Sequence, residues 1–176
     1  MSRGTGRTFD ERFALRVPAV VGVLLGGLRR MPPGSALRRR LIRRQVDRAF
    51  AAMARSDHEL VVLLYEPDAA VWMRSLAGVG FGDSYRGPEG IRALLADFDE
   101  AFAEWAWTAR AVADGGDRFA VRADFVGVGR SSGARTELQD GGTAVRLSDR
   151  GLVVWQEWFA EPGGWGKALE AVGLRE

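Results

Sequence analysis

The sequence predicts a single α+β domain, in which helices pack against a strongly curved, mostly antiparallel sheet. Three observations support this class. Apolar residues recur at helical spacing in two long stretches of the first 102 residues. Strand-like segments separated by Gly- and Asp-rich turns fill most of the chain after residue 104. The chain has 176 residues, which is about the length of one domain with a full hydrophobic core.

Two long helices and one short helix are expected ahead of the main strands. The first covers residues 36–55, where apolar residues recur every three or four positions and arginines fill much of the rest. Asp57 is a good N-cap for a short helix over 58–65, which Pro67 would stop. The second long helix covers 87–102 and has proline in its first turn, where the missing N–H does no harm. The buried stripe of this second helix is Ile91, Leu94, Leu95, Phe98 and Phe102.

Strands dominate the rest of the chain. A short strand is expected over 69–74, followed by a glycine-rich loop that leads to the second long helix. The later strands are separated by turns such as Asp-Gly-Gly-Asp at 114–117, which favours a hairpin. The last expected element is a short helix over 168–172, followed by a capping glycine. The four later strands cover residues 105–112, 118–128, 136–147 and 152–159.

Residues 1–34 are expected to form an arm outside the domain, which covers 35–176. The stretch Val17–Leu28 is apolar but only about twelve residues long, too short to span a bilayer. We interpret it as a short helix that packs on the domain, and the alternative is contact with a membrane surface. Proline and glycine at 32–34 then form a hinge between the arm and the domain. A cytoplasmic protein is expected.

Charge is distributed unevenly along the chain. Residues 1–55 contain 13 arginines and three acidic residues, whereas residues 56–176 carry a net charge of −8. We interpret the basic segment as one that lies over the acidic domain or over a partner. Nucleic acid is not expected as that partner, because the domain lacks the basic stripe with interleaved aromatic residues that such binding needs.

The residue inventory excludes several kinds of site. The chain has no cysteine, which removes disulfides, thiol catalysis and thiolate metal ligands. A zinc site or a Ser-His-Asp triad would depend on His58 alone, and the position of His58 after Asp57 indicates an exposed first turn of a helix. The glycines between 78 and 82 stand too far from the next helix to form a dinucleotide fingerprint. No metal ion and no cofactor are therefore expected.

Two of the expected strands carry charged residues at alternating positions. Because successive side chains of a strand point to opposite faces, Arg122 and Asp124 share one face. In the same way Trp155, Glu157 and Phe159 share a face of the last strand. An arginine and two carboxylates among aromatic residues indicate a lined cavity more than a solid core. The alternative is that Arg122 and Asp124 form an exposed pair on the outer surface of the sheet, which would be worth little energetically.

Several short motifs, in their order along the chain, resemble the SnoaL-like branch of the NTF2-like superfamily. They are the run Tyr85-Arg-Gly-Pro-Glu-Gly-Ile-Arg92, the turns at 129–133 and 149–151, and the segment 167–174. The resemblance covers about residues 38–174 and implies an NTF2-like (cystatin-like) cone: a bent sheet wrapped around helices, with an open-ended apolar cavity. It also implies a homodimer that pairs through the outer face of the sheet. The superfamily contains cyclases, isomerases, hydrolases and proteins without known activity, so the fold does not fix the function.

Within that superfamily, two segments resemble the catalytic strands of limonene-epoxide hydrolases. Arg122-Ala-Asp124 resembles their Arg-x-Asp pair, and Trp155-Gln-Glu157 resembles their Trp-x-Asp segment, with Glu in place of Asp. The resemblance implies that Glu157 is the base that activates a water, Asp124 the acid and Arg122 the bridge between them. Such a division of roles needs two carboxyl groups in unlike environments, and the acid must stay protonated near neutrality.

The first strand departs from the hydrolase pattern. Where those enzymes hold their water with a Tyr-x-Asn pair, this chain has Trp72, which cannot accept a hydrogen bond, and Arg74, which is always charged. Arg74 instead favours an anionic or carbonyl-bearing ligand. Tyr85 is a candidate ligand contact or an anchor for the loop beside it, and Trp107 also fits a core position. The residues expected to line a substrate pocket are Trp72, Arg74, Tyr85, Phe98, Phe102, Trp107, Trp155 and Phe159.

Three functions are consistent with these patterns. The first is a SnoaL-like pocket protein for a hydrophobic polyketide-, steroid- or terpene-like molecule, with cofactor-free acid–base chemistry as an isomerase, cyclase or hydrolase. The second is an epoxide hydrolase that uses Asp124, Glu157 and Arg122. The third is a binding or dimerisation module without catalysis, with the Arg-rich arm as its contact. Convergence of Asp124 and Glu157 in a cavity favours the two enzymes, whereas exposure of either favours the third.

Overall fold

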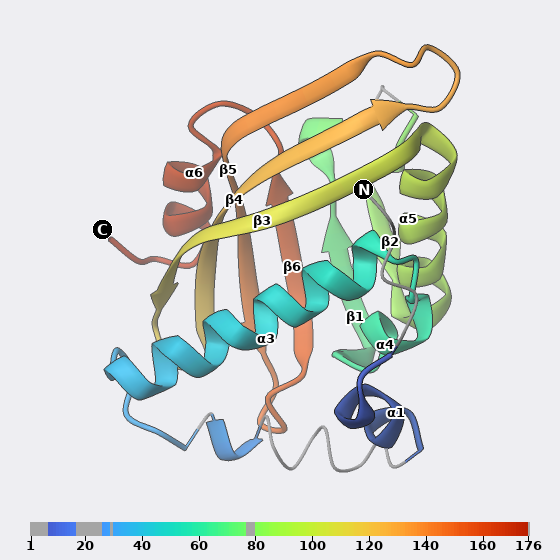
Figure 1. Cartoon of the computed structure of the whole chain (residues 1–176). Helices are drawn as coiled ribbons and strands as arrows, with labels where there is room; N and C mark the ends of the chain where they lie inside the picture. The colour runs from blue at the N-terminus through green and yellow to red at the C-terminus, as the bar shows by residue number, and fades with distance from the viewer. Residues whose placement is uncertain (1–6, 17–25, 29, 77–79, 176) are drawn as a thin grey trace.

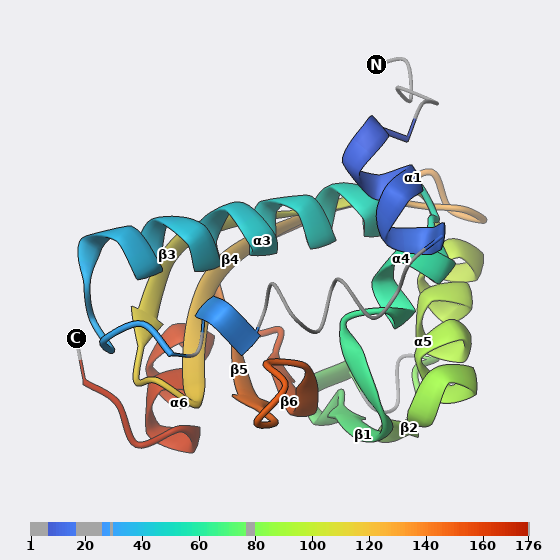
Figure 2. The same ribbon diagram turned by 90° about the horizontal axis from the view of Figure 1, so that it is seen from below.

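A six-stranded sheet forms the centre of the molecule, and helices lie on both of its faces (Figure 1). The structure is a computed structural model that describes residues 7–16, 26–28, 30–76 and 80–175. The long helix α3 crosses one face, here called the inner face, whereas α6 packs on the opposite, outer face (Figure 2). The expected α+β class is confirmed. The helices are α1 (Phe9–Arg16), α3 (Ala36–Ala54), α4 (His58–Val62), α5 (Gly87–Ala101) and α6 (Gly164–Ala171).

The strands follow one another in the sheet in the order β2-β1-β6-β5-β4-β3. The pairs from β3 to β6 are antiparallel neighbours in sequence, whereas β1 pairs in parallel with β6 and antiparallel with β2. The strands are β1 (Tyr65–Trp72), β2 (Ser84–Arg86), β3 (Phe102–Asp114), β4 (Arg118–Gly129), β5 (Arg135–Leu147) and β6 (Val153–Phe159).

Two irregularities interrupt the pairing of the long strands. The β3–β4 register shifts between Ala109 and Ala111, and the β4–β5 register shifts between Ala123 and Phe125. Opposite the second shift, Asp140 adopts a φ of 63°, a left-handed conformation that Asp tolerates better than most residues. Bulges of this kind bend strands, and β3, β4 and β5 curve strongly in Figure 1.

The edge of the sheet at β3 is covered by arginine side chains. Arg43 of α3 donates hydrogen bonds to the carbonyl oxygens of Ala109 and Arg110, at 2.5 and 3.0 Å. Arg130 donates to the carbonyl oxygen of Asp99 near the end of α5 and to that of Phe102, the first residue of β3. The contacts of Arg43 occupy strand carbonyl groups that would otherwise be open to pairing with another strand.

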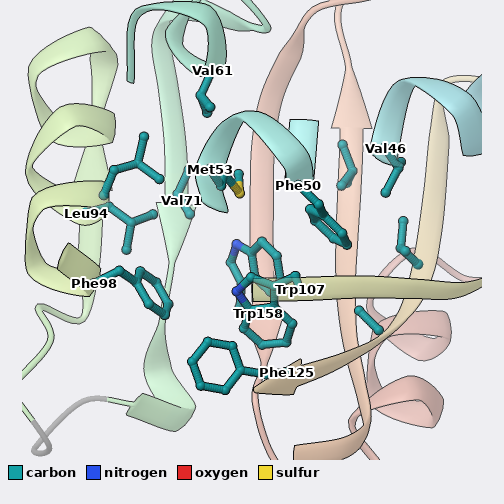
Figure 3. Close-up of a cluster of buried hydrophobic side chains, with 14 of the residues drawn as sticks. Val46, Phe50, Met53, Val61, Val71, Leu94, Phe98, Trp107, Phe125 and Trp158 are labelled. Atoms are coloured by element: carbon teal, nitrogen blue, oxygen red, sulfur yellow. The ribbon is translucent and has the colours of Figure 1, made fainter. Parts of the chain in front are cut away.

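Aliphatic side chains and a cluster of aromatic rings pack between the inner face and the helices α3 and α5 (Figure 3). The ring centroids of Trp107 and Trp158 are 4.6 Å apart, and those of Phe98 and Trp105 are 4.7 Å apart. Stacked and tilted rings at these distances add to the stability gained from burying apolar area. The interior of the cone is therefore largely a packed core.

A second, smaller core lies on the outer face under α6. It contains Ala120 and Ala144 of the sheet and Trp165 and Leu169 of the helix. Gly142 of β5 allows the close approach, because a Cβ atom there would lie 2.8 Å from the Cβ of Ala168 and 2.5 Å from the carbonyl oxygen of Gly164. Gly142 and Ala144 therefore lie on the outer face of the sheet, under α6.

The structure corrects several expected boundaries. The helix expected over 58–65 ends at Val62, and Tyr65 already begins β1, which continues through Pro67. Proline is tolerated there because residue 67 is outside the regular ladders. Strand β2 pairs with residues 70–72 of β1, and the register between β1 and β6 shifts between Tyr65 and Ala70. The sequence does not predict strand β2, and α6 begins at Gly164, four residues before the helix expected over 168–172.

The described parts of the N-terminal arm contact the domain. The guanidinium of Arg7 lies 2.7 Å from the carboxylate of Asp57, and Arg55 lies 2.9 Å from Glu11 of α1. Most of Val17–Leu28 lies outside the described residues. In the ranges that the structure covers, no helix has an apolar run long enough to cross a bilayer. The separation of arm and domain at residue 34 stays a prediction.

His58 is less exposed than expected. Its Nε2 atom lies 3.0 Å from a carboxylate oxygen of Asp99 in α5. The same carboxylate accepts hydrogen bonds from the Ser56 hydroxyl and from the indole N–H of Trp105, at 2.8 and 2.9 Å. The cluster joins α4, α5 and β3, and this structural role accounts for the histidine.

Candidate functional site

A cavity of about 90 Å³ lies between α3 and the inner face of the sheet. Helix α3 supplies one wall through its apolar stripe, and β4, β5 and β6 supply the opposite wall with alternate side chains. Its described walls are mostly aliphatic. The lining residues are Leu28, Arg38, Ile42, Gln45, Val46, Ala49, Phe50, Met53, Leu64, Tyr65, Phe119, Val121, Thr143, Val145, Leu147, Gly151, Val153 and Gln156.

A chain of neutral polar groups runs along the sheet side of this cavity. The hydroxyl of Tyr65 donates to the Oε1 atom of Gln156 at 2.5 Å, and Nε2 of Gln156 donates to the hydroxyl of Thr143 at 3.0 Å. The Thr143 hydroxyl in turn donates to the carbonyl oxygen of Glu157 at 3.1 Å. Burial raises the pKa of Tyr65, so its phenol stays neutral. The cavity therefore offers hydrogen bonding without a net charge.

The arm closes one side of the cavity. Leu28 contributes to the lining, and its carbonyl oxygen accepts a hydrogen bond from Arg38 at 3.1 Å. Arg38 also donates to the carbonyl oxygens of Met31 and Gly116, and its charge is paired with Asp114. A buried arginine thus holds the arm against α3 and against the turn between β3 and β4.

The residues expected to be catalytic lie on the outer face. Arg122 pairs across the sheet with Gly142, and Glu157 pairs with Ala144. Residues directly opposite each other in a sheet share a face, and both Gly142 and Ala144 lie under α6. Asp124, two positions from Arg122, lies on the same side, whereas Ala123 and Phe125 belong to the inner core. The expectation that these groups turn into a cavity is therefore corrected.

Ion pairs on the outer face also differ from the expected arrangement. Arg122 pairs with Asp140 at 2.7 Å, and Asp124 pairs with Arg110 at 2.6 Å, whereas the expected arrangement had Arg122 between Asp124 and Glu157. Burial tends to raise the pKa of Asp124. The hydrogen bonds from Arg110 and from the backbone N–H of Asp140 outweigh burial, and the pKa of Asp124 is lowered. A general acid needs the opposite shift, and the catalytic roles of these residues stay predictions.

Three of the expected substrate contacts are core residues. Phe98, Phe102 and Trp107 pack in the inner aromatic cluster and do not line the main cavity. Phe102 and Phe125 meet edge to face with centroids 5.2 Å apart, and Trp107 lies 4.8 Å from Phe125 (Figure 3 shows Phe98, Trp107 and Phe125). The sequence pattern identified aromatic residues of the interior, but the rings fill the space that a ligand was expected to occupy.

Three more of the expected contacts, Trp72, Trp155 and Phe159, lie on the outer face of the sheet. Trp155 and Phe159 pack with the outer core under α6, and the guanidinium of Arg146 lies 5.0 Å from the Trp155 ring centroid. Trp72 pairs with Glu157 and so shares its outer face. Arg74 begins a 3-10 turn (Arg74–Leu76), so the alternation of β1 does not extend to it.

Tyr85 anchors a loop. Its hydroxyl donates to the carboxylate of Asp97 and accepts a hydrogen bond from the backbone N–H of Gly82 at 2.8 Å. Burial and the hydrogen bond to Asp97 raise the pKa of Tyr85 to about 12. The ring of Tyr85 belongs to the inner core, and its hydroxyl anchors the loop at Gly82.

Sequence reasoning missed Tyr65, Thr143 and Gln156. The local pattern places Tyr65 at the end of a helix. In the structure Tyr65 begins β1, where it pairs with Val153, which is distant in sequence. Gln156 stands between Trp155 and Glu157, so the alternation rule did place it on the opposite face from them. Gln156 is a neutral polar residue on the more apolar face of its strand, and this feature could have marked it as a pocket residue.

The sequence model of the SnoaL-like domain family matches residues 46–156, more than half of the chain. This range contains Tyr65, Thr143, Gln156 and the C-terminal half of α3, but not the arm. A comparison with curated proteins found no match.

Solved structures with the same fold confirm the NTF2-like architecture. TerC, co-crystallised with polyporic acid, is 17% identical with a TM-score of 0.58, over 87% of this chain and 98% of that chain. An NTF2-like protein of unknown function from Burkholderia pseudomallei K96243 is 17% identical with a TM-score of 0.60, over 72% and 93%. RV0760c from Mycobacterium tuberculosis, in complex with estradiol-17beta-hemisuccinate, is 17% identical with a TM-score of 0.56, over 68% and 91%. Identities this low establish the fold alone.

Proposed function

The chain belongs to the SnoaL-like domain family, and on that basis we propose that it binds an uncharged, mostly apolar small molecule between α3 and the inner face of the sheet. The observation that carries the proposal is the cavity of about 90 Å³, whose aliphatic walls enclose the neutral chain Tyr65–Gln156–Thr143. Ligand pockets typically combine apolar walls with a few placed polar groups.

The polar chain indicates which ligand groups are recognised. Tyr65 donates its only hydroxyl hydrogen to Gln156, which leaves lone pairs that can accept from a ligand hydroxyl. The amide of Gln156 has a second N–H that can donate to a ligand carbonyl or hydroxyl oxygen. A charged ligand would lose its hydration without a compensating charge, because the guanidinium of Arg38 is already paired with Asp114.

The size of the cavity limits the ligand. Pockets for drug-sized molecules enclose about 300–1,000 Å³, so a cavity of about 90 Å³ holds a small ring or one end of a larger molecule. Polyketide-, steroid- and terpene-like molecules remain within the proposed class through such an apolar end. Support for small-molecule binding in this fold comes from TerC and RV0760c, whose structures were obtained with polyporic acid and estradiol-17beta-hemisuccinate.

The proposed role is binding rather than acid–base turnover. Among the described lining residues there is no Asp, Glu or His, and the phenol of Tyr65 is held neutral. Proton abstraction in such a cavity would lack a base of suitable pKa.

Calorimetric titration with phenol, cyclohexanol and benzoate tests the proposal. The two neutral ring compounds are expected to bind, and benzoate is expected to bind at least tenfold more weakly because its charge must be buried. Ala49→Phe places a ring into the cavity from α3 and is expected to weaken phenol binding at least tenfold. Ala51→Phe, on the exposed side of the same helix, is the matched control. Equal affinity of both variants for phenol would refute the proposed site.

We also propose, as the family resemblance suggests, a homodimer through the part of the outer face that α6 leaves open, in the cytoplasm. Support comes from the alternating charges there, where Arg110 pairs with Asp124 and Arg122 with Asp140. A two-fold axis could place each positive group beside the partner copy's negative group. Light scattering of the purified chain measures the mass, and a monomer at high concentration would contradict the dimer.

A further inference from the structure

Two hollows lie side by side in the interior. The main cavity of about 90 Å³ is separated from a void of about 10 Å³ that lies between α5 and the inner aromatic cluster. Of the described residues, Met53 and Tyr65 line both hollows. These two side chains therefore form the partition. The other residues around the small void are Val61, Ile91, Leu94, Leu95, Phe98, Trp105, Trp107 and Trp158.

The two halves of the partition differ in their freedom to move. Tyr65 is fixed by its hydrogen bond of 2.5 Å to Gln156. The apolar side chain of Met53, in the last turn of α3, belongs to the inner core, where Figure 3 shows it between Phe50 and Leu94, and no hydrogen bond from the described residues holds it. Methionine is unbranched with three rotatable bonds, and it fills irregular gaps in several conformations. Met53 is therefore the movable half.

The lining behind Met53 suits an apolar ring, but the void of about 10 Å³ admits one only when the side chain of Met53 moves or is shortened. The small void is bounded by aliphatic and aromatic side chains, among them that of Tyr65. Trp107 and Trp158, whose ring centroids are 4.6 Å apart, both line it. An aromatic ring that reached this place would gain ring contacts in addition to burial of its area.

We propose that Met53 determines the size of ligand that the cavity accepts, because its side chain blocks the way from the main cavity to the aromatic floor at Trp107 and Trp158. The inference rests on the proposed function and adds a specificity-determining residue to it. In this arrangement one-ring ligands bind in front of Met53, and two-ring ligands bind only when its side chain turns aside or is shortened.

The test compares phenol with 2-naphthol by calorimetric titration of the full chain. The wild type is expected to bind phenol at least as tightly as 2-naphthol. Met53→Ala is expected to raise the affinity for 2-naphthol relative to phenol at least tenfold, because the two hollows become one. Met53→Val, which keeps more of the core packing, is expected to shift the ratio in the same direction by a smaller factor.

Leu95→Ala is the matched control, since Leu95 lines the small void but not the main cavity. This substitution enlarges the small void but keeps Met53 in place. Its ratio of 2-naphthol affinity to phenol affinity is therefore expected to stay within twofold of the wild-type ratio. Folding of each variant is checked by its thermal melt.

Two results would overturn the inference or the proposed function. If the wild type binds phenol and both Met53 variants keep the wild-type ratio of 2-naphthol to phenol affinity, the inference is overturned and the proposed function stands. Absence of phenol binding by the wild type would refute the proposed function. In that case, 2-naphthol binding by a Met53 variant alone would still support the partition, and no binding by either Met53 variant would overturn both.

Discussion

The carboxylate of Asp114 in β3 lies 3.0 Å from the guanidinium of Arg38 in α3, and the two side chains are only 0% and 1% exposed. Asp114 also accepts hydrogen bonds from the backbone N–H groups of Gly34 and Gly116. The pair joins the arm, the first turn of α3 and the β3–β4 turn at one end of the cavity. A buried pair of this kind is costly to break, because the remaining charge has no water around it.

Arg38→Met is expected to destabilise the protein by about 3–5 kcal/mol, since the carboxylate of Asp114 would stay buried without its partner. Urea unfolding followed by circular dichroism measures the change. Arg40→Met, at an exposed position of the same helix, is the control and should change the free energy of unfolding by less than about 0.5 kcal/mol. Similar losses in the two variants would contradict the role assigned to the pair.

Two truncations test the arm. Removal of residues 1–34 takes away the carbonyl oxygens of Leu28 and Met31 that Arg38 contacts, whereas removal of residues 1–25 leaves them. Both products are expected to unfold cooperatively, with the shorter chain less stable by about 1–3 kcal/mol because of unpaired buried N–H groups. Thermal melts of the two products give the comparison. Equal stability would show that residues 26–34 add nothing, and a non-cooperative melt would place the arm within the core.

The docking of α1 is expected to depend on pH. The hydrogen bonds from Arg7 lower the pKa of Asp57 below its ordinary value of 3.8, against burial, which raises it. A lowered folded-state pKa means that this stabilisation is present above about pH 4 and is lost as the pH falls through the folded value. Arg7→Ala should therefore reduce the free energy of unfolding at pH 7 by about 1 kcal/mol or less, and by a smaller amount at pH ~2. Urea unfolding at both pH values measures the change, with Arg16→Ala as the control. An equal loss of unfolding free energy at pH 7 and pH ~2 would contradict the prediction.

Tyr65→Phe is expected to weaken the binding of phenol roughly tenfold, because the hydroxyl that accepts the ligand hydrogen bond is lost, which corresponds to about 1.4 kcal/mol. Tyr85→Phe is the matched control, since its hydroxyl contacts Asp97 and Gly82 away from the cavity. Calorimetric titration at one temperature gives both constants. A larger effect of Tyr85→Phe than of Tyr65→Phe would move the ligand site elsewhere.

Asp124→Asn and Glu157→Gln are each expected to leave phenol affinity within about twofold of the wild type, because both carboxylates lie on the outer face. The hydrolase alternative makes a different prediction, namely that each substitution abolishes hydrolysis of an epoxide such as limonene oxide without unfolding the protein. Product analysis by gas chromatography decides between the two. Turnover by the wild type that is lost in both variants would reinstate Asp124 and Glu157 as catalytic residues.

Local sequence patterns predicted most of the elements. The helical spacing of apolar residues gave α3 and α5, and Asp-Gly-Gly-Asp gave the β3–β4 hairpin, because these signals act within a few residues. The incorrect helical prediction at Tyr65 has a long-range cause, not a local one. A segment that reads as the end of a helix becomes a strand because Val153, far along the chain, provides a parallel partner.

Alternation along the strands determined which residues lie together, but not the side of the sheet on which they lie. Trp155, Glu157 and Phe159 do share a face, as predicted, and Gln156 lies on the other. Which face is inner was decided by packing: Gly142 lets α6 cover one side, while the apolar stripe of α3 covers the other. The period of two is a local property of extended backbone, whereas the choice of face follows from where apolar area elsewhere in the chain can be buried, and only the folded structure contains that information.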